Sequence, residues 1–212
     1  MKCEELGRSM IEMLGVLAIV GVLSVGGIAG YSKAMKKYKY NKLASEFTMF
    51  IQELYNYKSD LAKEKERLSP DEHMAIASYI EGMGILPAGW KRQNHIIVDS
   101  MGNRINPFIR NTPGRLDYGL ISLDYSLLSD TADDLCIFMF SNIIFNSTDW
   151  LVSAGAYGQN SADGSHSSTG WYGNTYCGNG RRCIKDMTMA DVLNVCHFCS
   201  EEQDGCVLVL KY

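Results

Sequence analysis

The chain has 212 residues, a net charge of −4 at neutral pH and a pI of about 5.6. Its 21% charged and 46% hydrophobic residues are typical of a globular protein and exclude an intrinsically disordered chain. Because there is no broad basic patch beyond one helix flank, nucleic acid is not expected as a partner. The length suits one domain that follows a long N-terminal helix, with about 150 residues left to bury a core.

A run of residues fit to span a bilayer begins close to the N-terminus. Residues 13–31 contain no charged side chain, and a single carboxylate, Glu12, stands just before them. A run of this length is about what a helix needs to cross ~30 Å of hydrocarbon. A carboxylate at the edge of such a segment is costly in lipid, so it needs a partner, for which a cation is the obvious choice.

The stretch Gly7-Arg8-Ser9-Met10-Ile11-Glu12-Met13-Leu14, together with the apolar run, resembles the N-terminus of type IV prepilins and of their relatives, the pseudopilins of type II secretion. The resemblance implies that residues 1–7 are a leader and that a prepilin peptidase/methyltransferase cuts between Gly7 and Arg8 and methylates the new amino group. It also implies that Glu12 pairs with the terminal ammonium of a neighbouring subunit.

Two features depart from that family. Arg8 stands where Phe or Met is usual, and the leader carries two Glu where such leaders are usually basic. The alternative is an uncleaved signal anchor or a secretory signal peptide. A secretory signal has an apolar core of about 7–15 residues before a small-residue cleavage site, and the run here is longer.

The helix is expected to continue beyond the membrane half, residues 8–31. In that half Gly21, Gly26 and Gly30 allow the backbones of neighbouring helices to approach closely. No proline interrupts residues 1–69, so one helix from near Ser9 to about Asp60 is expected, roughly 75 Å long. Within residues 32–66, apolar side chains recur mainly every three, four or seven residues and predict an amphipathic half: Met35, Tyr38, Leu43, Phe47, Phe50, Leu54 and Leu61.

One charge signal disagrees with an extracytoplasmic C-terminal domain. Five lysines follow the apolar run, at positions 33, 36, 37, 39 and 42, and the positive-inside rule alone would keep the C-terminal side in the cytoplasm. The cysteine content and the prepilin pattern both indicate an extracytoplasmic C-terminal domain, and these two features agree independently.

Residues 67–212 are predicted to form a globular head. Ser69, Pro70 and Glu72 predict the start of a helix that runs to about Glu81. The patterns that follow predict, in chain order, a strand at 95–99, a turn at 100–103, a strand at 115–123, a helix at 127–146, a short strand at 149–154, an exposed loop rich in Gly and Ser at 155–180, a short helix from Thr188 to about Phe198, and an apolar strand at 206–212 that is central or paired on both sides.

This order resembles type IVb pilins, including the pilins of conjugative thin pili, in which a Leu-Pro…Trp segment and a strand precede a helix that bears a cysteine. The resemblance implies an α+β pilin fold. In it, the long N-terminal helix packs on an antiparallel sheet, with extra short helices and a disulfide-bonded C-terminal region.

Six of the seven cysteines lie outside the leader, which contains Cys3. An even number clustered towards the C-terminus predicts disulfides formed in an oxidising compartment. A metal site is the alternative, because the CxxC formed by Cys196 and Cys199 together with Cys177 and Cys183 offers four thiolate ligands. The second pair has five residues between its members, a poor match to zinc spacing, so no metal or cofactor is expected.

Six cysteines allow fifteen pairings. Cys177 and Cys183 are close in sequence and are expected to close a small local loop, Cys177–Cys183. A bridge between Cys196 and Cys199 would pin nothing distant. The pilin resemblance implies a link from Cys136 to the C-terminal region; Cys136–Cys199 is chosen with Cys196–Cys206 as the remaining pair, and Cys136–Cys196 is the close alternative.

No catalytic constellation is evident, and the chain is not expected to be an enzyme. The four histidines are scattered, and adjacent carboxylates such as Asp133 and Asp134 point apart on a helix. The expected function is a structural subunit, a major or minor pilin, of a type IV pilus-like filament. The alternatives are a type II secretion pseudopilin and a membrane-anchored extracytoplasmic thiol oxidoreductase that uses Cys196 and Cys199.

The expected location is the bacterial inner membrane, crossed once with the C-terminal domain outside the cytoplasm, and then an extracellular pilus or a periplasmic pseudopilus. The expected partners are identical or related pilin subunits, the prepilin peptidase/methyltransferase, the inner-membrane assembly machinery and, before assembly, the lipid bilayer.

Overall fold

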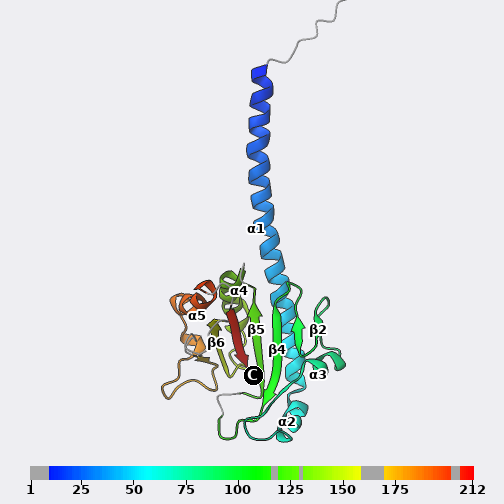
Figure 1. The fold of residues 1–212 in the computed structure, drawn as a ribbon. Helices are drawn as coiled ribbons and strands as arrows, with labels where there is room; N and C mark the ends of the chain where they lie inside the picture. Colours follow the sequence, from blue (N-terminus) through cyan, green and yellow to red (C-terminus); the bar gives the residue numbers. More distant parts are fainter. Residues whose placement is uncertain (1–9, 116–118, 129–130, 159–169, 202–205) are drawn as a thin grey trace, which may run out of the picture. The chain divides into compact units, whose positions relative to one another are not determined.

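The computed structural model describes residues 10–115, 119–128, 131–158, 170–201 and 206–212, without the side chains of residues 200 and 201. The chain divides into two compact units, residues 1–41 and 42–212, and each is described by itself (Figure 1). The first unit is helical throughout its described part. The second contains mixed helix and antiparallel sheet and holds the disulfides.

Helix α1 (Met10–Asn56) belongs to both units. It ends four residues before the expected Asp60, because the backbone tightens at Tyr57. The N–H of Tyr57 bonds to the carbonyl of Leu54 at 3.2 Å, and that of Asp60 bonds to the carbonyl of Tyr57 at 3.1 Å. Bonds of this shorter span close the α-helix, and a second helix, α2 (Lys58–Glu66), follows.

The head is built on one sheet of eight strands, in the order β2-β3-β4-β5-β8-β6-β7, with β1 also paired to β4. All of the ladders between these strands are antiparallel. The bounds are β1 His73–Ala75, β2 Lys91–Gln93, β3 Ile96–Val98, β4 Arg104–Arg110, β5 Ile121–Leu127, β6 Ser153–Gly158, β7 Trp171–Tyr172 and β8 Cys206–Lys211.

The C-terminal strand β8 lies between β5 and β6, which confirms that it is paired on both sides. Leu208 stands opposite Tyr125 on one neighbour and Ala156 on the other. The apolar sequence of β8 fits this position, because both edges are hydrogen-bonded and Cys206, Leu208 and Leu210 are fully buried.

The core of the head forms between the sheet and the last turns of α1. Phe47 contacts Tyr125 with ring centroids 5.4 Å apart, and Phe50 contacts Trp90 at 5.2 Å. Each such buried side chain contributes roughly 1.5–3 kcal/mol of apolar burial. The predicted amphipathic face is thus confirmed from Leu43 to Leu61, whereas Tyr38 is 61% exposed.

The helix predicted to start at Ser69 is wrong in its first half. Glu72 accepts the Ser69 N–H through its side chain at 2.8 Å, as a capping residue would, but Asp71 adopts a φ of +64°. That left-handed conformation turns the chain out of a helical path. Strand β1 follows and pairs with β4, so the helix, α3, spans only Ala77–Gly82.

Helices α4 (Ala132–Met139) and α5 (Met189–Glu201) confirm the two later helix predictions, with changed bounds. A π-helical turn, η3 (Phe140–Ile144), extends α4, and a short 3₁₀-helix, η4 (Ile184–Asp186), precedes α5. Thr188 and Asp191 start α5 by bonding each other's backbone and side chains, and the Thr188 bonds hold the Asp191 pKa below its usual value.

Two strand predictions need correction. The strand expected at 115–123 is displaced to β5, and the strand expected at 149–154 begins at Ser153. Strand β4 was not predicted, and it contains Pro107, a residue type that normally argues against a central strand. The Pro107 carbonyl accepts the Ile76 N–H, so its ring nitrogen faces the same side, between the segments of β4 that pair with β3 and β1. No ladder bond is needed from that nitrogen.

Candidate functional site

The N-terminal unit exposes an uninterrupted apolar surface. Every residue of α1 from Met10 to Ala34 is exposed, and its large hydrophobic side chains are between 53% and 84% exposed. Among the described residues, α1 is the one helix long and apolar enough to cross a membrane, a test that a signal sequence near the N-terminus would also pass. A contiguous surface of this kind marks a site that contacts lipid or protein.

Two polar side chains of this segment, Ser24 and Glu12, have different surroundings. The Ser24 hydroxyl donates to the Val20 carbonyl at 2.7 Å, so its donor is satisfied within the helix. Glu12 lies in the first turn of α1, where the unpaired N–H groups of a helix favour a negative charge. Gly7 and Arg8 lie outside the described residues, so the cleavage site stays a prediction, as does the pairing of Glu12 with a neighbouring subunit.

The three glycines predicted to pack against other helices, Gly21, Gly26 and Gly30, face open space. A Cβ built on any of them would meet no described atom within 4 Å beyond the helix's own neighbouring backbone. Packing inside the described chain therefore does not require glycine at these positions. Close approach of another helix stays the prediction for them.

Three disulfides hold the head together. Cys177–Cys183 is the local bridge that the sequence predicts. Cys136 bonds to Cys196 with Cα atoms 5.7 Å apart, and Cys199 bonds to Cys206 at 4.7 Å. The chosen pairs Cys136–Cys199 and Cys196–Cys206 are therefore wrong, and the alternative Cys136–Cys196 is the one formed.

The geometry of α5 explains why Cys196 and Cys199 have the opposite partners to those expected. Cys199 lies nearly one turn closer than Cys196 to the end of α5 from which the chain passes into β8, so Cys199 meets Cys206 at the start of that strand. Cys196 lies a turn earlier and meets Cys136 on α4. The two bridges tie α4 to α5 and α5 to β8.

The CxxC cysteines thus serve two different partners. Cys196 and Cys199 are each 2% exposed, and Cys136 and Cys206 are fully buried. Thiol–disulfide exchange requires an attacking thiolate to reach a sulfur atom. This burial leaves the two bridges poorly accessible to that attack.

A buried carboxylate that the sequence analysis missed lies in the head part of α1. Glu46 is 6% exposed and accepts hydrogen bonds from Trp90 Nε1 at 3.0 Å and from Ser100 Oγ at 2.7 Å. The Lys42 ammonium stands 3.6 Å from its other oxygen. The two hydrogen bonds join α1 to the segments before β2 and after β3, and the position on the buried helical face was the available signal.

A second buried carboxylate organises the turn between β3 and β4. Asp99 accepts the N–H groups of Met101 and Asn103 and the side-chain amide of Asn103. It also accepts the Tyr125 hydroxyl, which places the turn against β5. The sequence predicts the turn but not this network, whose partners are up to 26 residues apart.

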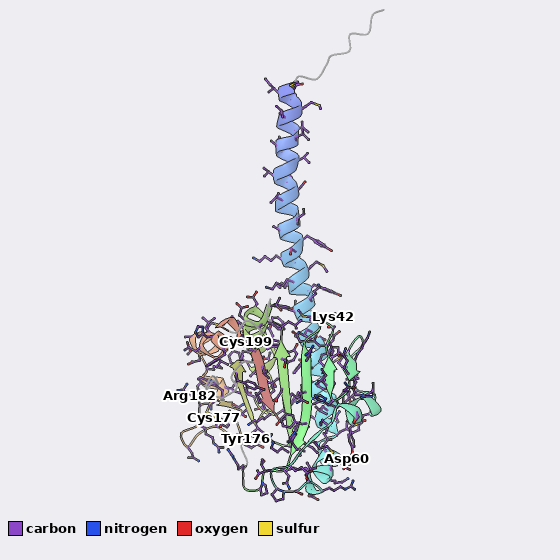
Figure 2. The ribbon with its side chains drawn as sticks, viewed as in Figure 1. Lys42, Asp60, Tyr176, Cys177, Arg182 and Cys199 are labelled. Atoms are coloured by element: carbon purple, nitrogen blue, oxygen red, sulfur yellow. A yellow bond between two sulfur atoms is a disulfide. The ribbon has the colours of Figure 1, made fainter. Side chains whose placement is uncertain are left out.

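The described part of the Gly- and Ser-rich segment, residues 155–180, is partly strand and partly loop, and Asn174, Thr175 and residues 178–180 are exposed. Residues 155–158 belong to β6, and residues 159–169 lie outside the described part. Arg181 stacks over the Tyr172 ring at 5.1 Å and Arg182 over the Trp171 ring at 5.5 Å. A Cβ at Gly173 would lie 1.9 Å from the Leu151 carbonyl oxygen, so this close approach requires glycine. Figure 2 labels Tyr176 and Cys177 in this segment and Arg182 just after it.

Two ionisable groups in the sheet, Asp124 and Tyr157, have raised pKa values. Burial raises the pKa of the Asp124 carboxyl to about 6, against the opposing effect of Arg110 and Lys211. Burial, and then the charge of Asp124, raises the pKa of Tyr157 to about 12. These groups lie on β4, β5, β6 and β8.

The remaining features offer little chemistry. A cavity of about 70 Å³ lies beside Ile51, Trp150 and Tyr212, and a shallow depression of about 330 Å³ is bordered by Lys58 and Lys65 among others. Among the described residues, no group of three or more His, Cys, Asp or Glu is placed to hold a metal ion. No family model, curated protein or solved structure matches the chain.

Proposed function

We propose that this chain is a structural subunit, a major or minor pilin, of a type IV pilus-like filament. The observation that carries the proposal is α1, whose first half exposes its apolar side chains on all sides and bears one carboxylate, Glu12, in its first turn. The mixed helix-and-sheet head with three disulfides supports it.

In this proposal the apolar half of α1 stores the subunit in the inner membrane after the leader is removed at Gly7. Assembly replaces the surrounding lipid with the helices of other subunits. Glu12 then pairs with the terminal ammonium of Arg8 on a neighbour. In a water-poor bundle such a pair attracts far more strongly than on a surface, and an unpaired Glu12 is penalised, so the pair sets the axial register.

The disulfide arrangement supports an extracytoplasmic head. Structural disulfides persist in oxidising compartments such as the periplasm. The Cys136–Cys196 and Cys199–Cys206 bridges connect α4, α5 and the central strand β8 covalently. A head linked in this way resists unravelling from its C-terminal end, which suits a subunit that bears tension.

Two other functions compete with the proposal. A type II secretion pseudopilin would use the same helix and the same Glu12, and differs in the machinery that assembles it. A thiol oxidoreductase would need Cys196 and Cys199 to form and break a shared bridge at an accessible site. Their burial and their separate partners speak against that function.

Processing gives the first test. Mass spectrometry of protein extracted from the membrane of a host that contains a prepilin peptidase is expected to show a chain that begins at Arg8, N-methylated. An intact Met1, or a cut after Tyr31, would contradict the proposal.

The second test is Glu12→Ala. The variant is expected to insert in the membrane as well as the parent chain does, since a costly charge is removed, but to enter filaments at a small fraction of the parent's level. Glu53→Ala is the matched control, because Glu53 is an exposed carboxylate on the same helix. Equal filament yields for both variants would refute the role of Glu12.

A further inference from the structure

Four lysines and two tyrosines follow the apolar run on α1. Lys33, Lys36, Lys37 and Lys39 are all exposed, and Tyr31 and Tyr38 are 68% and 61% exposed. We call these six residues the lysine collar. The proposed filament function assigns them no role.

The directions in which the collar residues point are informative. At 3.6 residues per turn the four lysines span roughly 160° of the helix circumference, and the two tyrosines lie near the opposite side. A helix that lies flat on a membrane carries its polar residues on one face only. Here the helix is apolar on all sides up to residue 30, and cations and phenols then surround it. This pattern suits a helix that stands upright through a headgroup layer, where Tyr and Lys are the usual anchoring residues.

The position of the collar matches the thickness of a bilayer. Residues 13–31 form about 28 Å of helix, close to the ~30 Å hydrocarbon layer. Residues 33–39 add roughly 9 Å, compared with about 5–8 Å for one headgroup layer. When the apolar run is inserted, the lysines therefore lie at the depth of the lipid phosphates.

The charges around the collar favour lipid over a second copy of this helix. From residue 13 to residue 45 the chain contains five lysines and no carboxylate, so the same segment of a neighbouring copy would repel the collar. Within the described residues, the ion pairs of the helical region join Lys42 to Glu46, Lys63 to Asp60 and Arg67 to Glu64, and none of them uses Lys33, Lys37 or Lys39. Lys36 lies over the Tyr40 ring, 5.6 Å from its centroid. Lys33, Lys37 and Lys39 thus present cations for an anion supplied from outside the chain.

We infer that the lysine collar is a binding site for the phosphate groups of anionic phospholipids. The inference rests on the proposed membrane-stored subunit and adds a partner to it. Clustered lysines are attracted to the negative surface of an anionic leaflet. The collar would hold the subunit at a fixed depth and surround it with anionic lipid before assembly.

The test uses the full-length chain reconstituted in phosphatidylcholine vesicles that contain a minor fraction of phosphatidylglycerol. Spin-labelled analogues of the two lipids report by electron paramagnetic resonance which one is motionally restricted at the protein. The wild type is expected to prefer phosphatidylglycerol roughly two- to fivefold, the upper value corresponding to about 1 kcal/mol. The preference is expected to fall towards one in 1 M salt, where the Debye length is about 3 Å.

The decisive variant combines K33Q, K36Q, K37Q and K39Q. It is expected to lose the preference while remaining resistant to alkaline extraction from the vesicles. The matched control combines K58Q, K65Q, K91Q and K185Q, which removes the same charge from the head and is expected to keep the preference.

The outcomes separate this inference from the proposed function. A wild type that inserts but shows no lipid preference refutes the collar alone. Loss of the preference in both quadruple variants also refutes it, because overall charge would then be the cause. A wild type that fails to insert in either lipid removes the proposed membrane storage and the collar together. Lysines that pair instead with another subunit would appear as a collar variant with unchanged lipid preference but lower filament yield.

Discussion

The two parts of helix α1 make opposite use of similar residues. Leu23, in the first unit, is 69% exposed, whereas Leu43, Phe47 and Leu54, in the second, are at most 1% exposed. The helical backbone is continuous through both parts, so local propensity forms the helix in each case. What differs is the covering surface. The head buries its own part of α1 against residues such as Trp90 and Tyr125, whereas the side chains of the first half remain exposed in the described structure.

The exposed apolar surface of the first half of α1 is large in free-energy terms. Thirteen large hydrophobic side chains between Met10 and Tyr31 are exposed. Their transfer out of water would contribute on the order of 20–40 kcal/mol, several times the stability of an ordinary domain. The apolar half of α1 therefore requires lipid or other helices, while the head holds its own core. All four predictions below use unfolding followed by tryptophan fluorescence in detergent, which reports on the head because Trp90, Trp150 and Trp171 all lie there.

Paired truncations give the largest expected contrast. Phe47→Ala removes a fully buried ring that contacts Trp90 and Tyr125 and is expected to lower the free energy of unfolding of the head by about 3–5 kcal/mol. Leu23→Ala is expected to change it by less than about 0.5 kcal/mol. Equal losses from the two substitutions would show that the helix halves are not energetically distinct.

The long-range disulfide comes next. Cys136→Ala combined with Cys196→Ala opens a bridge with a sequence separation of 60 residues and is expected to cost about 2–4 kcal/mol. The control, Cys177→Ala with Cys183→Ala, opens a bridge with a separation of only 6 residues, so the chain-entropy model gives a smaller loss. Non-reducing peptide mapping of the parent checks the pairings themselves. A Cys136–Cys199 peptide would contradict the structure.

The buried carboxylate of α1 is expected to have an intermediate effect. Glu46→Ala leaves the Trp90 Nε1–H and the Ser100 hydroxyl without their acceptor, at a cost of about 2 kcal/mol. Glu53→Ala removes an exposed carboxylate of the same helix and is expected to be close to neutral. If the two variants unfold at the same denaturant concentration, the Glu46 network does not stabilise the head.

The smallest effect concerns pH. The pKa of Asp124 rises from 3.8 to about 6 on folding, so the folded chain binds this proton more tightly than the unfolded chain does. That stabilisation is complete below pH 3.8 and is lost as the pH rises through about 6.

The full shift corresponds to about 3 kcal/mol, and solvent screening of this half-buried carboxyl lowers the contribution. Asp124→Asn removes the titration, so the variant is expected to gain about 1–2 kcal/mol relative to wild type between pH 4 and pH 8. Asp186→Asn, at an exposed position, serves as the control. A difference between wild type and Asp124→Asn that does not change with pH would contradict the raised pKa.

The failures of sequence analysis share a cause. Local rules considered alone predict a helix through Asp71 and argue against a strand at Pro107. A helix start was expected at Ser69 because the capping side chains are present, and they do bond, yet strand β1 pairs with β4 directly afterwards. Proline normally argues against a strand, but Pro107 lies between the segments of β4 that pair with β3 and β1, where no ladder bond is needed from its nitrogen. In each case a contact from a distant part of the chain outweighed the local preference.

The sequence by itself determined the features that depend on neighbours along the chain. These are the apolar half of the N-terminal helix, its buried face from Leu43 onwards, the helix start at Thr188, the local Cys177–Cys183 bridge and the apolar strand at the C-terminus. Each follows from spacing or composition within a few residues, where the helical period, capping and burial act directly.

Only the tertiary structure decided which distant groups meet. It placed β8 between β5 and β6, brought Cys136 to Cys196, and buried Glu46 against Trp90 and Ser100. With Cys177–Cys183 paired, the three possible pairings of the other four cysteines and the registers of the sheet are nearly equivalent at the level of sequence. They become distinct only when packing fixes the distance between elements, because a disulfide or a buried hydrogen bond forms only where its two partners are held in contact.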